Sequence, residues 1–488
     1  MNNIKSARMI LGFFMAILSL ISCNKKDGVA AELSVSPSAI TFPVEGGASD
    51  ITISSNAGWS VNNPLSSWLQ IDKTTGNSGS TTIHLTTLGQ NETGATRSGI
   101  LEISSSNGQS RRVAVTQPAT IYPSYNTSPK ASDTTGMSST AVQLAAKMHM
   151  GINFGNTMES PNEGEWVSSK ITESYVKFVK QTGFNAVRIP CNWVWSHLSD
   201  RGKAKIDPTW LNRVKEVVGW CVANDVYVIL NAHGDNGWLE RNVNKVKQDS
   251  VNAMEKAIWE QIATAMRDFD EHLIFAGANE PTAENAEQMS ILMSYHQTFI
   301  NAVRATGGRN SHRVLVVQGP RTDSYLTSDL MTTLPVDLVP NRLMVEVHCY
   351  SPSTFNLLTD GDVSWGNMVY YWGAGNHSTI EPERNATSGE EAALIDELGK
   401  MKKFVDKGIP VVLGEYASWR RTPGLGKPVP KDLAMHNKSV EYWATFVTKT
   451  AKANGLLPFW WEIGFMLDRA NNVAKDQALL DAIIAGYK

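Results

Sequence analysis

The stretch LIFAGANEP, residues 273–281, decides the fold, because an apolar run of strand-like residues ends abruptly in polar ones. Seven similar runs alternate along the chain with longer segments of helical spacing. Counted with the first, the expected strands cover residues 150–154, 186–189, 226–231, 273–278, 314–318, 343–348, 411–414 and 457–460. Strands that alternate with helices predict βα units around a parallel sheet.

Helix signals lie between these runs. Asp207 and Pro208 supply an N-cap and a first-turn proline, and Ser388 with Glu391 predicts a capping box. Eight strands within residues 141–488 fit a (β/α)8 TIM barrel, an α/β fold, better than an open doubly wound sheet. No glycine-rich phosphate loop follows the first predicted strand at residues 150–154, so no cofactor of the dinucleotide type is expected.

The amino-terminal part has a different character. Residues 32–118 alternate in short segments separated by Gly, Asn and Ser, which predicts an immunoglobulin-like β-sandwich. Trp59 and Trp68 lie in or beside its strands, where core packing is the usual fate of a large aromatic, although both could stack on sugar rings. Residues 119–140, rich in Ser, Thr and Pro, predict an exposed linker.

The first residues resemble a secretory signal. Basic residues precede an apolar run at 9–21, which is short for a membrane span of about 20 residues. The run ends in LISC at 20–23, which resembles a bacterial lipobox. We therefore expect a signal peptide at residues 1–22, acylation of the Cys23 thiol, an anchor segment at 23–31, and attachment to a membrane through the lipid.

Charge and cysteine content exclude other classes. A net charge of -3 gives no basic field for nucleic acid. Cys191, Cys221 and Cys349 are odd in number, widely spaced and set in apolar surroundings. They predict buried thiols rather than disulfides or zinc ligands.

Polar and aromatic residues gather where the predicted strands end, which is where a barrel carries its catalytic groups. In strand order they are Arg188, then Asn231 and His233, then Asn279 and Glu280, then His348 and Tyr350, then Glu415, then Trp460 and Trp461. Glu280 and Glu415 therefore face each other across one mouth. Such a pair suits glycoside cleavage, because one carboxyl protonates the leaving oxygen and the other attacks the anomeric carbon. Their surroundings must push the two pKa values apart.

At these residues the chain resembles glycoside hydrolase family 5. The motifs GFNAVRIP, VYVILNAH, IFAGANEP, VEVHCY, VVLGEY and PFWW occur in that family's order. GINFGNTMES and the segment around KIDPTWLNRV look most like subfamily 4, whose endo-β-1,4-glucanases include xyloglucanases, licheninases and cellulases. Residues 32–118, with SVSPSAITFPVEGG and ITISSNAGWSV, look like a BACON domain, a module for which carbohydrate binding has been proposed.

The resemblance implies roles for individual residues. Glu280 would be the acid/base and Glu415 the nucleophile of a retaining mechanism. Asn279 would donate to the sugar 2-hydroxyl, while Arg188 and Tyr350 would hold Glu415 ionised.

Further residues would line the substrate site. His233 and His348 would lie near the cleaved sugar, and without metal-type spacing they predict no metal site. Trp461 would stack on that sugar and Trp460 would face the core, although the two could exchange. Asn231 and Trp238 are further candidates for substrate contacts.

Two departures from the family pattern fall in substrate-facing loops. His233-Gly234-Asp235 replaces the His-His-Asp of many subfamily 4 members, and Trp461-Glu462-Ile463-Gly464 replaces the commoner Trp-Asp-Asn-Gly. Substrate identity is the inference that these departures weaken most.

The resemblance therefore implies an endo-β-1,4-glucanase of a β-glucan polysaccharide, with xyloglucan favoured. Mixed-linkage glucan, cellulose and β-mannan remain alternatives, and a non-catalytic glycan-binding lipoprotein is a remote one. A monomer is expected. An extended polymer substrate favours a bacterial outer-membrane lipoprotein that faces the cell exterior.

Overall fold

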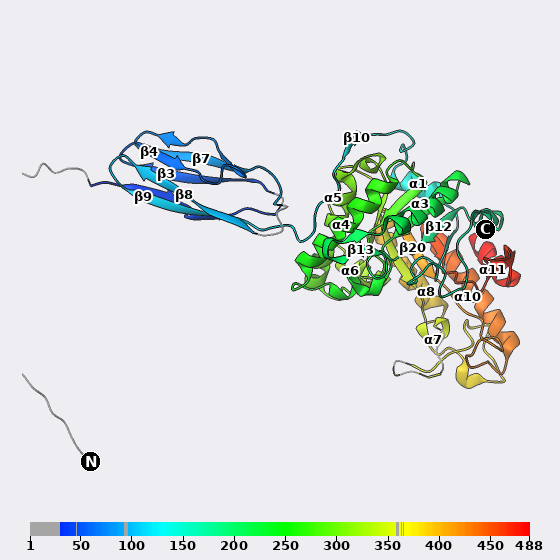
Figure 1. The fold of residues 1–488 in the computed structure, drawn as a ribbon. Coiled ribbons are helices and arrows are strands. Elements are labelled where there is room, and N and C mark those ends of the chain that lie inside the picture. The colour runs from blue at the N-terminus through cyan, green and yellow to red at the C-terminus, as the bar shows by residue number, and fades with distance from the viewer. Residues whose placement is uncertain (1–29, 45, 92–95, 358–360, 363, 365) are drawn as a thin grey trace, which may run out of the picture. The chain divides into compact units, whose positions relative to one another are not determined.

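The computed structural model describes residues 30–488, apart from residues 45, 92–95, 358–360, 363 and 365. The chain divides between Ala119 and Thr120 into two compact units (Figure 1). The predicted signal peptide and Cys23 lie outside the described residues. Within the described ranges, no helix is both long and apolar enough to cross a bilayer.

The first unit is a β-sandwich, as predicted. One sheet has the order β1 (Leu33–Ser36), β3 (Ala48–Ser55), β7 (Gly79–Thr87), β5 (Leu69–Ile71), and the other β2 (Ala39–Thr41), β9 (Ser110–Gln117), β8 (Arg97–Ser105), β4 (Trp59–Asn62), β6 (Thr75–Gly76). Alternation along the strands turns residues such as Ile51 and Ile53 into the core. Trp59 and Trp68 are only 4% and 8% exposed, so core packing is confirmed for both.

The second unit contains a closed eight-stranded parallel barrel, which confirms the predicted fold. Its strands, in order, are β11 (Gly151–Asn153), β12 (Ala186–Ile189), β15 (Tyr227–Asn231), β16 (Leu273–Ala276), β18 (Leu315–Gln318), β19 (Leu343–Cys349), β20 (Val411–Tyr416) and β21 (Leu456–Trp460). The ring closes where Gly151 pairs with Phe459. A Cβ at Gly151 would overlap with that phenyl ring, so glycine is needed at the closure.

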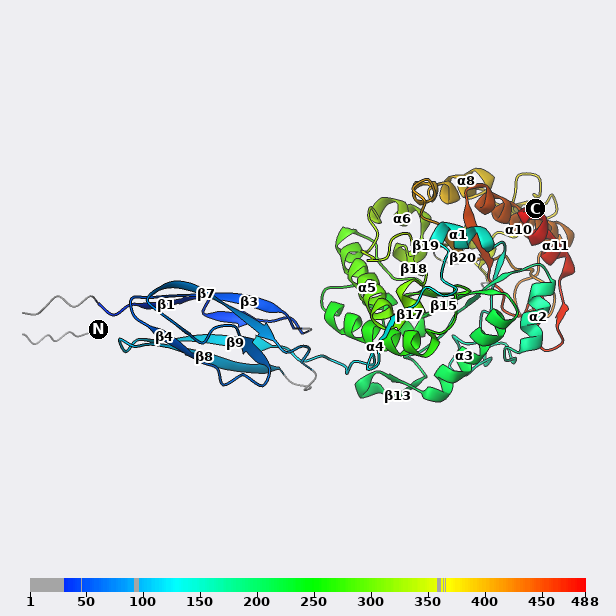
Figure 2. The same cartoon turned by 90° about the horizontal axis from the view of Figure 1, so that it is seen from above.

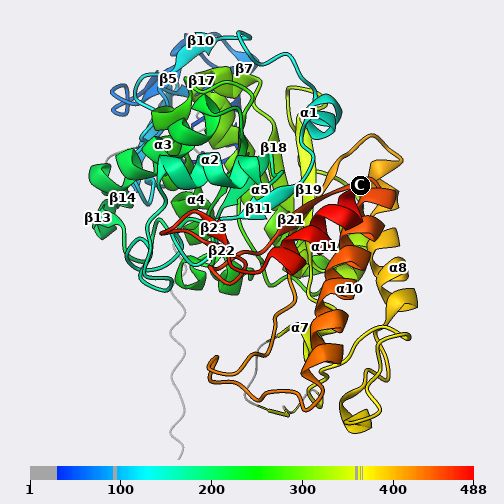
Figure 3. The same ribbon diagram turned by 90° about the vertical axis from the view of Figure 1, so that its right-hand side faces the viewer.

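Helices surround the barrel (Figure 2). The helices of this unit are α1 (Ala141–Lys147), α2 (Glu173–Gln181), α3 (Pro208–Ala223), α4 (Gln248–Met266), α5 (Ala286–Ala305), α6 (Ser324–Leu330), α7 (Ser353–Asn356), α8 (Glu391–Gly399), α9 (Lys402–Val405), α10 (Leu433–Ala453) and α11 (Gln477–Tyr487). The last two lie side by side (Figure 3). Helix α1 packs through Leu144 against strand residues such as Ile229 and Ile274. Short strands add β13 (Leu198–Asp200), β14 (Lys205–Ile206), β22 (Leu467–Asp468) and β23 (Val473–Ala474).

One of the two predicted helix starts is correct. The Asp207 carboxylate accepts the N–H of Thr209 at 2.8 Å, and Pro208 is the first residue of α3. The capping box at Ser388 is wrong, because α8 begins after Glu390, which makes no side-chain capping bond.

Residues 119–140 were expected to form an exposed linker, but the part from residue 120 on, which belongs to the second unit, makes hydrogen bonds to the barrel unit. Although largely exposed, this segment is fastened to the barrel unit: Glu260 accepts the N–H of Tyr125 at 2.6 Å, and Glu271 accepts the N–H of Ser139 at 2.9 Å. Between these points, β10 (Lys130–Ser132) pairs with β17 (Gly307–Gly308). The segment is therefore a strap on the barrel unit.

The cysteines behave as predicted. Cys191, Cys221 and Cys349 are buried and free, and burial raises the pKa of each thiol, so all three are protonated hydrophobes at neutral pH.

Candidate active site

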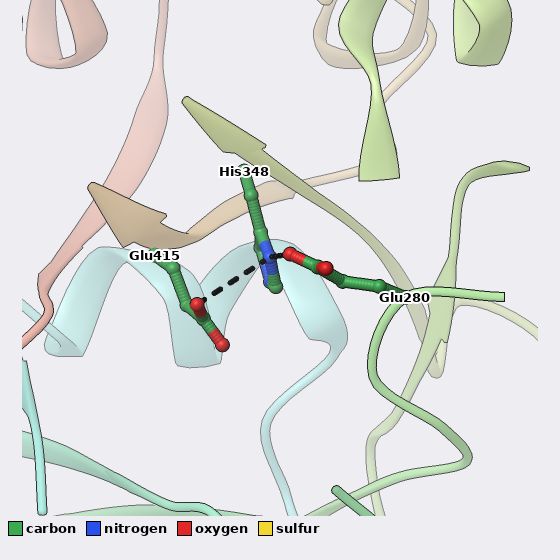
Figure 4. A group of neighbouring side chains, drawn as sticks. All are labelled: Glu280, His348 and Glu415. Atoms are coloured by element: carbon green, nitrogen blue, oxygen red, sulfur yellow. Dashed lines mark hydrogen bonds and ion pairs between the residues drawn. The ribbon is translucent and has the colours of Figure 1, made fainter. Parts of the chain in front are cut away.

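A β-bulge delivers Glu415 to the mouth of the barrel. Val347 of β19 pairs with Leu413, but His348 pairs with Glu415, so Gly414 is the extra residue of the bulge. A Cβ at Gly414 would overlap with the Glu346 carboxylate, which explains why glycine stands there. The shift turns Glu415 and His348 toward Glu280, which follows β16 (Figure 4).

The two predicted catalytic carboxyls lie close together. One oxygen of Glu280, one of Glu415 and one ring nitrogen of His348 all lie within 4.8 Å of one another. A separation of about 5 to 5.5 Å is typical of retaining glycosidases, whereas inverting enzymes need about 6.5 Å or more to admit a water. The spacing therefore suits direct attack by one of the carboxylates.

Arg188 is the electrostatic centre beneath the pair. Its buried guanidinium lies 2.8 Å from Glu415 Oε1 and 2.7 Å from Glu346 Oε1. It also donates to Asn279 Oδ1 at 2.7 Å and to Asn153 Oδ1 at 3.0 Å. A planar fork with several donors suits this role, because it orients two carboxylates and two amides at once.

Sequence reasoning missed Glu346 and Asn153. Glu346 is fully buried inside the apolar strand LMVEVHC, and a charge in such a run is a signal that was overlooked. Asn153 ends β11 and donates to the carbonyl of Gly414 at 2.8 Å, so it holds the bulge in place.

Glu415 is almost fully buried and strongly oriented. Besides the ion pair with Arg188, it accepts the Tyr350 hydroxyl on Oε2 at 2.9 Å. Burial raises its pKa, while His348, Arg188 and the Tyr350 hydrogen bond lower it in part, leaving the pKa above its ordinary value.

This balance predicts the effect of Tyr350→Phe. The variant removes a group that stabilises the carboxylate, so the acid limb of kcat/KM should move to higher pH. Loss of a hydrogen bond to a charged group predicts a decrease of roughly 10- to 100-fold in kcat/KM at neutral pH. The measurement is the pH profile on a soluble β-glucan. An acid limb that stays in place or moves to lower pH would show that Tyr350 does not stabilise ionised Glu415.

His348 lies among three carboxylates. Its Nδ1 lies 2.7 Å from Glu280 Oε1 and 3.8 Å from Glu415 Oε2, and its Nε2 lies 3.3 Å from Glu346 Oε1. Burial lowers its pKa, but the three carboxylates outweigh burial and raise the pKa to about 10. His348 is therefore an imidazolium at neutral pH.

The pKa of Glu280 differs from the raised value that suits a carboxyl acting as proton donor. Burial raises it, but the hydrogen bond and charge of His348 lower it further, so the net pKa is below its ordinary value. An isolated proton donor would need the opposite shift. The proton instead resides on His348, whose Nδ1 lies 2.7 Å from Glu280 Oε1.

Glu280, His348 and Glu415 also form a set that could hold a metal ion. Both nitrogens of His348 face carboxylates, and an imidazolium has no lone pair for a metal. The donor set fits proton transfer better than metal binding.

The residues after β15 and β21 form one wall of the mouth. His233 stacks on Trp461 with ring centroids 5.5 Å apart and lies 3.9 Å from Glu415 Oε1. Burial lowers the pKa of His233 well below its ordinary value, so its ring is neutral. Asn231 is fully buried and lies 3.3 Å from His233 Nδ1, so it orients that ring instead of facing the mouth.

The tryptophans separate by burial. Trp460 is 1% exposed and packs edge-on against Tyr416, whereas Trp461 is partly exposed. Trp460 is therefore packed in the core, and Trp461 keeps a partly exposed ring beside His233. Trp238 is partly exposed, and its indole donates to Asp235 at 3.0 Å.

Two further aromatics were missed by sequence reasoning. Trp166 follows β11 and Trp195 follows β12, and their rings lie 6.4 Å apart with Trp166 48% exposed. Their position in loops after consecutive strands was the available signal. Both rings lie in loops at the end of the barrel that carries Glu280 and Glu415.

Comparison with known proteins identifies the family of the barrel unit. Residues 146–466 match the model of the cellulase family, glycosyl hydrolase family 5, and residues 57–118 match BACON, described as a putative amino-terminal binding domain. A xyloglucan-specific endo-β-1,4-glucanase from Bacteroides ovatus is 31% identical over 98% of this chain and 96% of its own.

Solved structures extend the likeness. A Bacteroides ovatus GH5 xyloglucanase in complex with a XXXG heptasaccharide has a TM-score of 0.69 at 29% identity, covering 93% of this chain and all of its own. A GH5 xyloglucan-specific β-1,4-glucanase from a ruminal metagenomic library has a TM-score of 0.65 at 36% identity, covering 72% and 96%. The chain belongs to glycoside hydrolase family 5 and carries an amino-terminal BACON domain.

Proposed function

We propose that this glycoside hydrolase is a retaining endo-β-1,4-glucanase whose preferred substrate is xyloglucan, with Glu415 as nucleophile and Glu280 as acid/base. The observation that carries the proposal is the pair of carboxyls within 4.8 Å, one buried on Arg188 and Tyr350 and the other open and bonded to His348.

The chemistry follows from these contacts. Glu415 attacks the anomeric carbon while Glu280 passes a proton to the leaving oxygen, which breaks the glycosidic bond and forms a glycosyl ester on Glu415. Glu280, now ionised, takes a proton from a water that attacks the same carbon and frees Glu415. Asn279 is held by Arg188, which leaves its amide to donate to the sugar 2-hydroxyl.

The preference for xyloglucan is supported by the relatives that carry that name. Trp461 offers a ring surface beside His233 and Glu415, and Trp166 and Trp195 offer two more in the loops after β11 and β12. Other structural neighbours are described as broad-specificity endoglucanases, so mixed-linkage glucan and cellulose are the second candidates.

The test of substrate is a comparison of kcat/KM on xyloglucan, mixed-linkage glucan, carboxymethylcellulose and β-mannan, with product sizing. We expect the highest value on xyloglucan and fragments of intermediate size. A higher value on mannan would reject the glucanase assignment. Release of no reducing sugar from any of the four would support the non-catalytic alternative.

Stereochemistry is a separate prediction. Proton NMR during hydrolysis of a cello-oligosaccharide should show the β-anomer of the product first, with the α-anomer appearing later by mutarotation. An initial α-anomer would mean inversion, and would exclude Glu415 as a nucleophile.

We further propose that the enzyme is a monomer anchored by lipid on Cys23 and facing the cell exterior, with the BACON domain as a spacer. The lipobox-like LISC supports the anchor, and burial of Trp59 and Trp68 favours a spacer over sugar stacking by these rings. Protease treatment of whole cells tests the location: an enzyme that survives until the cells are lysed would face the periplasm.

A further inference from the structure

One residue outside the catalytic pair holds the main chain of Glu280. Glu240 begins a short turn, η3 (Glu240–Asn242), in the loop after β15. Its Oε1 accepts the backbone N–H of Glu280 at 3.0 Å and that of Gly234 at 3.1 Å. Its carbonyl oxygen accepts the N–H of Thr282 at 2.9 Å and also the Thr282 hydroxyl. Glu240 therefore grips the loop after β16 on both sides of Pro281.

The contacts of Glu280 show why this grip matters. Among the described residues Glu280 makes two polar contacts, its N–H to Glu240 and its Oε1 to His348. Its side chain is 45% exposed, so packing constrains it little. The place of its carboxyl is set by Glu240 through the main chain and by His348 through the side chain.

We infer that Glu240 is a positioning residue for proton transfer: its carboxylate holds the main chain of Glu280 so that the acid/base reaches the leaving oxygen. The inference rests on the retaining-glycosidase part of the proposed function and is independent of the preference for xyloglucan.

The charge of Glu240 also supports a role in proton transfer, because it acts on the pKa of Glu280. Burial raises the pKa of Glu240 to about 6, with the charges of Glu280 and Glu415 adding to the rise and the N–H groups of Glu280 and Gly234 opposing it. By the same repulsion, ionised Glu240 disfavours the ionised form of Glu280. His348 and Arg188 lower the pKa of Glu280, whereas the charge of Glu346 raises it. The charge of Glu240 raises that pKa as well.

The hydrogen bond to Glu240 also explains why glycine stands at position 234. Gly234 has φ +54° and ψ −59°, a conformation that other residues rarely adopt, and in it the N–H points at Glu240. A Cβ there would lie 4.0 Å from Glu240 Oε2, so the backbone conformation and not space favours glycine. Gly234, which replaces the second histidine of His-His-Asp, therefore lies in the loop whose Glu240 holds the main chain of Glu280.

The test compares Glu240→Ala and Glu240→Gln with the wild type on two substrates. Carboxymethylcellulose has a poor leaving group, and 2,4-dinitrophenyl β-cellobioside has one that needs little protonation. Glu240→Ala should lose at least roughly tenfold in kcat/KM on the polymer and less than about threefold on the aryl glycoside. Glu240→Gln keeps an acceptor oxygen but no charge, so it should stay within about threefold at its optimum, with the alkaline limb moved to lower pH.

Glu284→Gln is the matched control, because Glu284 is exposed on the same loop and pairs with Arg321. It should change neither the substrate ratio nor the pH profile. Equal losses of Glu240→Ala on both substrates, with a lowered melting temperature, would mean a structural role only and overturn the inference. If the alanine variant does not fold, an unshifted alkaline limb in Glu240→Gln overturns it. A wild type that also releases no reducing sugar from xyloglucan would instead reject the proposed function.

Discussion

Glu415→Ala should lower kcat by roughly 10⁴-fold or more on every β-glucan and aryl cellobioside, because no other group can form the glycosyl ester. The loss should be independent of leaving-group acidity, since the nucleophile is missing whatever departs. The folded state should persist, because the small side chain leaves Arg188 paired with Glu346 at 2.7 Å.

Azide gives this prediction a positive readout. With 2,4-dinitrophenyl β-cellobioside, azide can occupy the space left by the carboxylate and attack the anomeric carbon, which yields the α-glycosyl azide. The exposed Glu284→Gln serves as control and should retain wild-type activity. Residual activity of Glu415→Ala above about a hundredth of wild type, without azide, would show that the nucleophile has been assigned wrongly.

Glu280→Ala should behave differently on the two kinds of substrate. General acid catalysis is worth about 10²- to 10⁴-fold, so kcat/KM on carboxymethylcellulose should decrease by roughly 10³-fold. On 2,4-dinitrophenyl β-cellobioside the first step needs no proton, and kcat/KM should decrease by less than about tenfold.

The second step distinguishes the roles further. Without a base, the glycosyl ester on Glu415 should accumulate, and azide should release it as the β-glycosyl azide, opposite in configuration to the product from Glu415→Ala. Equal losses on both substrates would reject Glu280 as the acid/base. So would an α-azide from this variant.

The barrel and its carboxyl pair were predictable because each rests on a local pattern. Apolar runs such as 226–231 and 411–414 mark the strands, and the ends of parallel strands share one mouth. Glu280 and Glu415 could therefore be placed together before any contact was known. The strand boundaries differ by two residues at most.

What could not be predicted depends on hydrogen bonds between distant segments. The strap at 120–140 has no apolar periodicity. Its backbone N–H groups donate hydrogen bonds to the carboxylates of Glu260 and Glu271 in the barrel unit. Glu240 grips Glu280 from 40 residues away in the same manner. The direction of the Glu280 pKa could not be predicted, because Glu346, buried within a strand, adds a third carboxylate that keeps His348 charged.

The short distance between His348 and Glu415 couples the protonation of the His348–Glu280 pair to the state of Glu415. At about 4 Å and an effective dielectric constant near 20, a charge pair is worth ~4 kcal/mol, and here Nδ1 and Oε2 are 3.8 Å apart. When Glu415 becomes a glycosyl ester, that attraction vanishes and the His348–Glu280 pair holds its proton less tightly. When water restores the carboxylate, the attraction returns. The pair therefore favours its protonated form while Glu415 is ionised, when the leaving oxygen needs a proton. It shifts toward its deprotonated form while the glycosyl ester exists, when the attacking water must lose one.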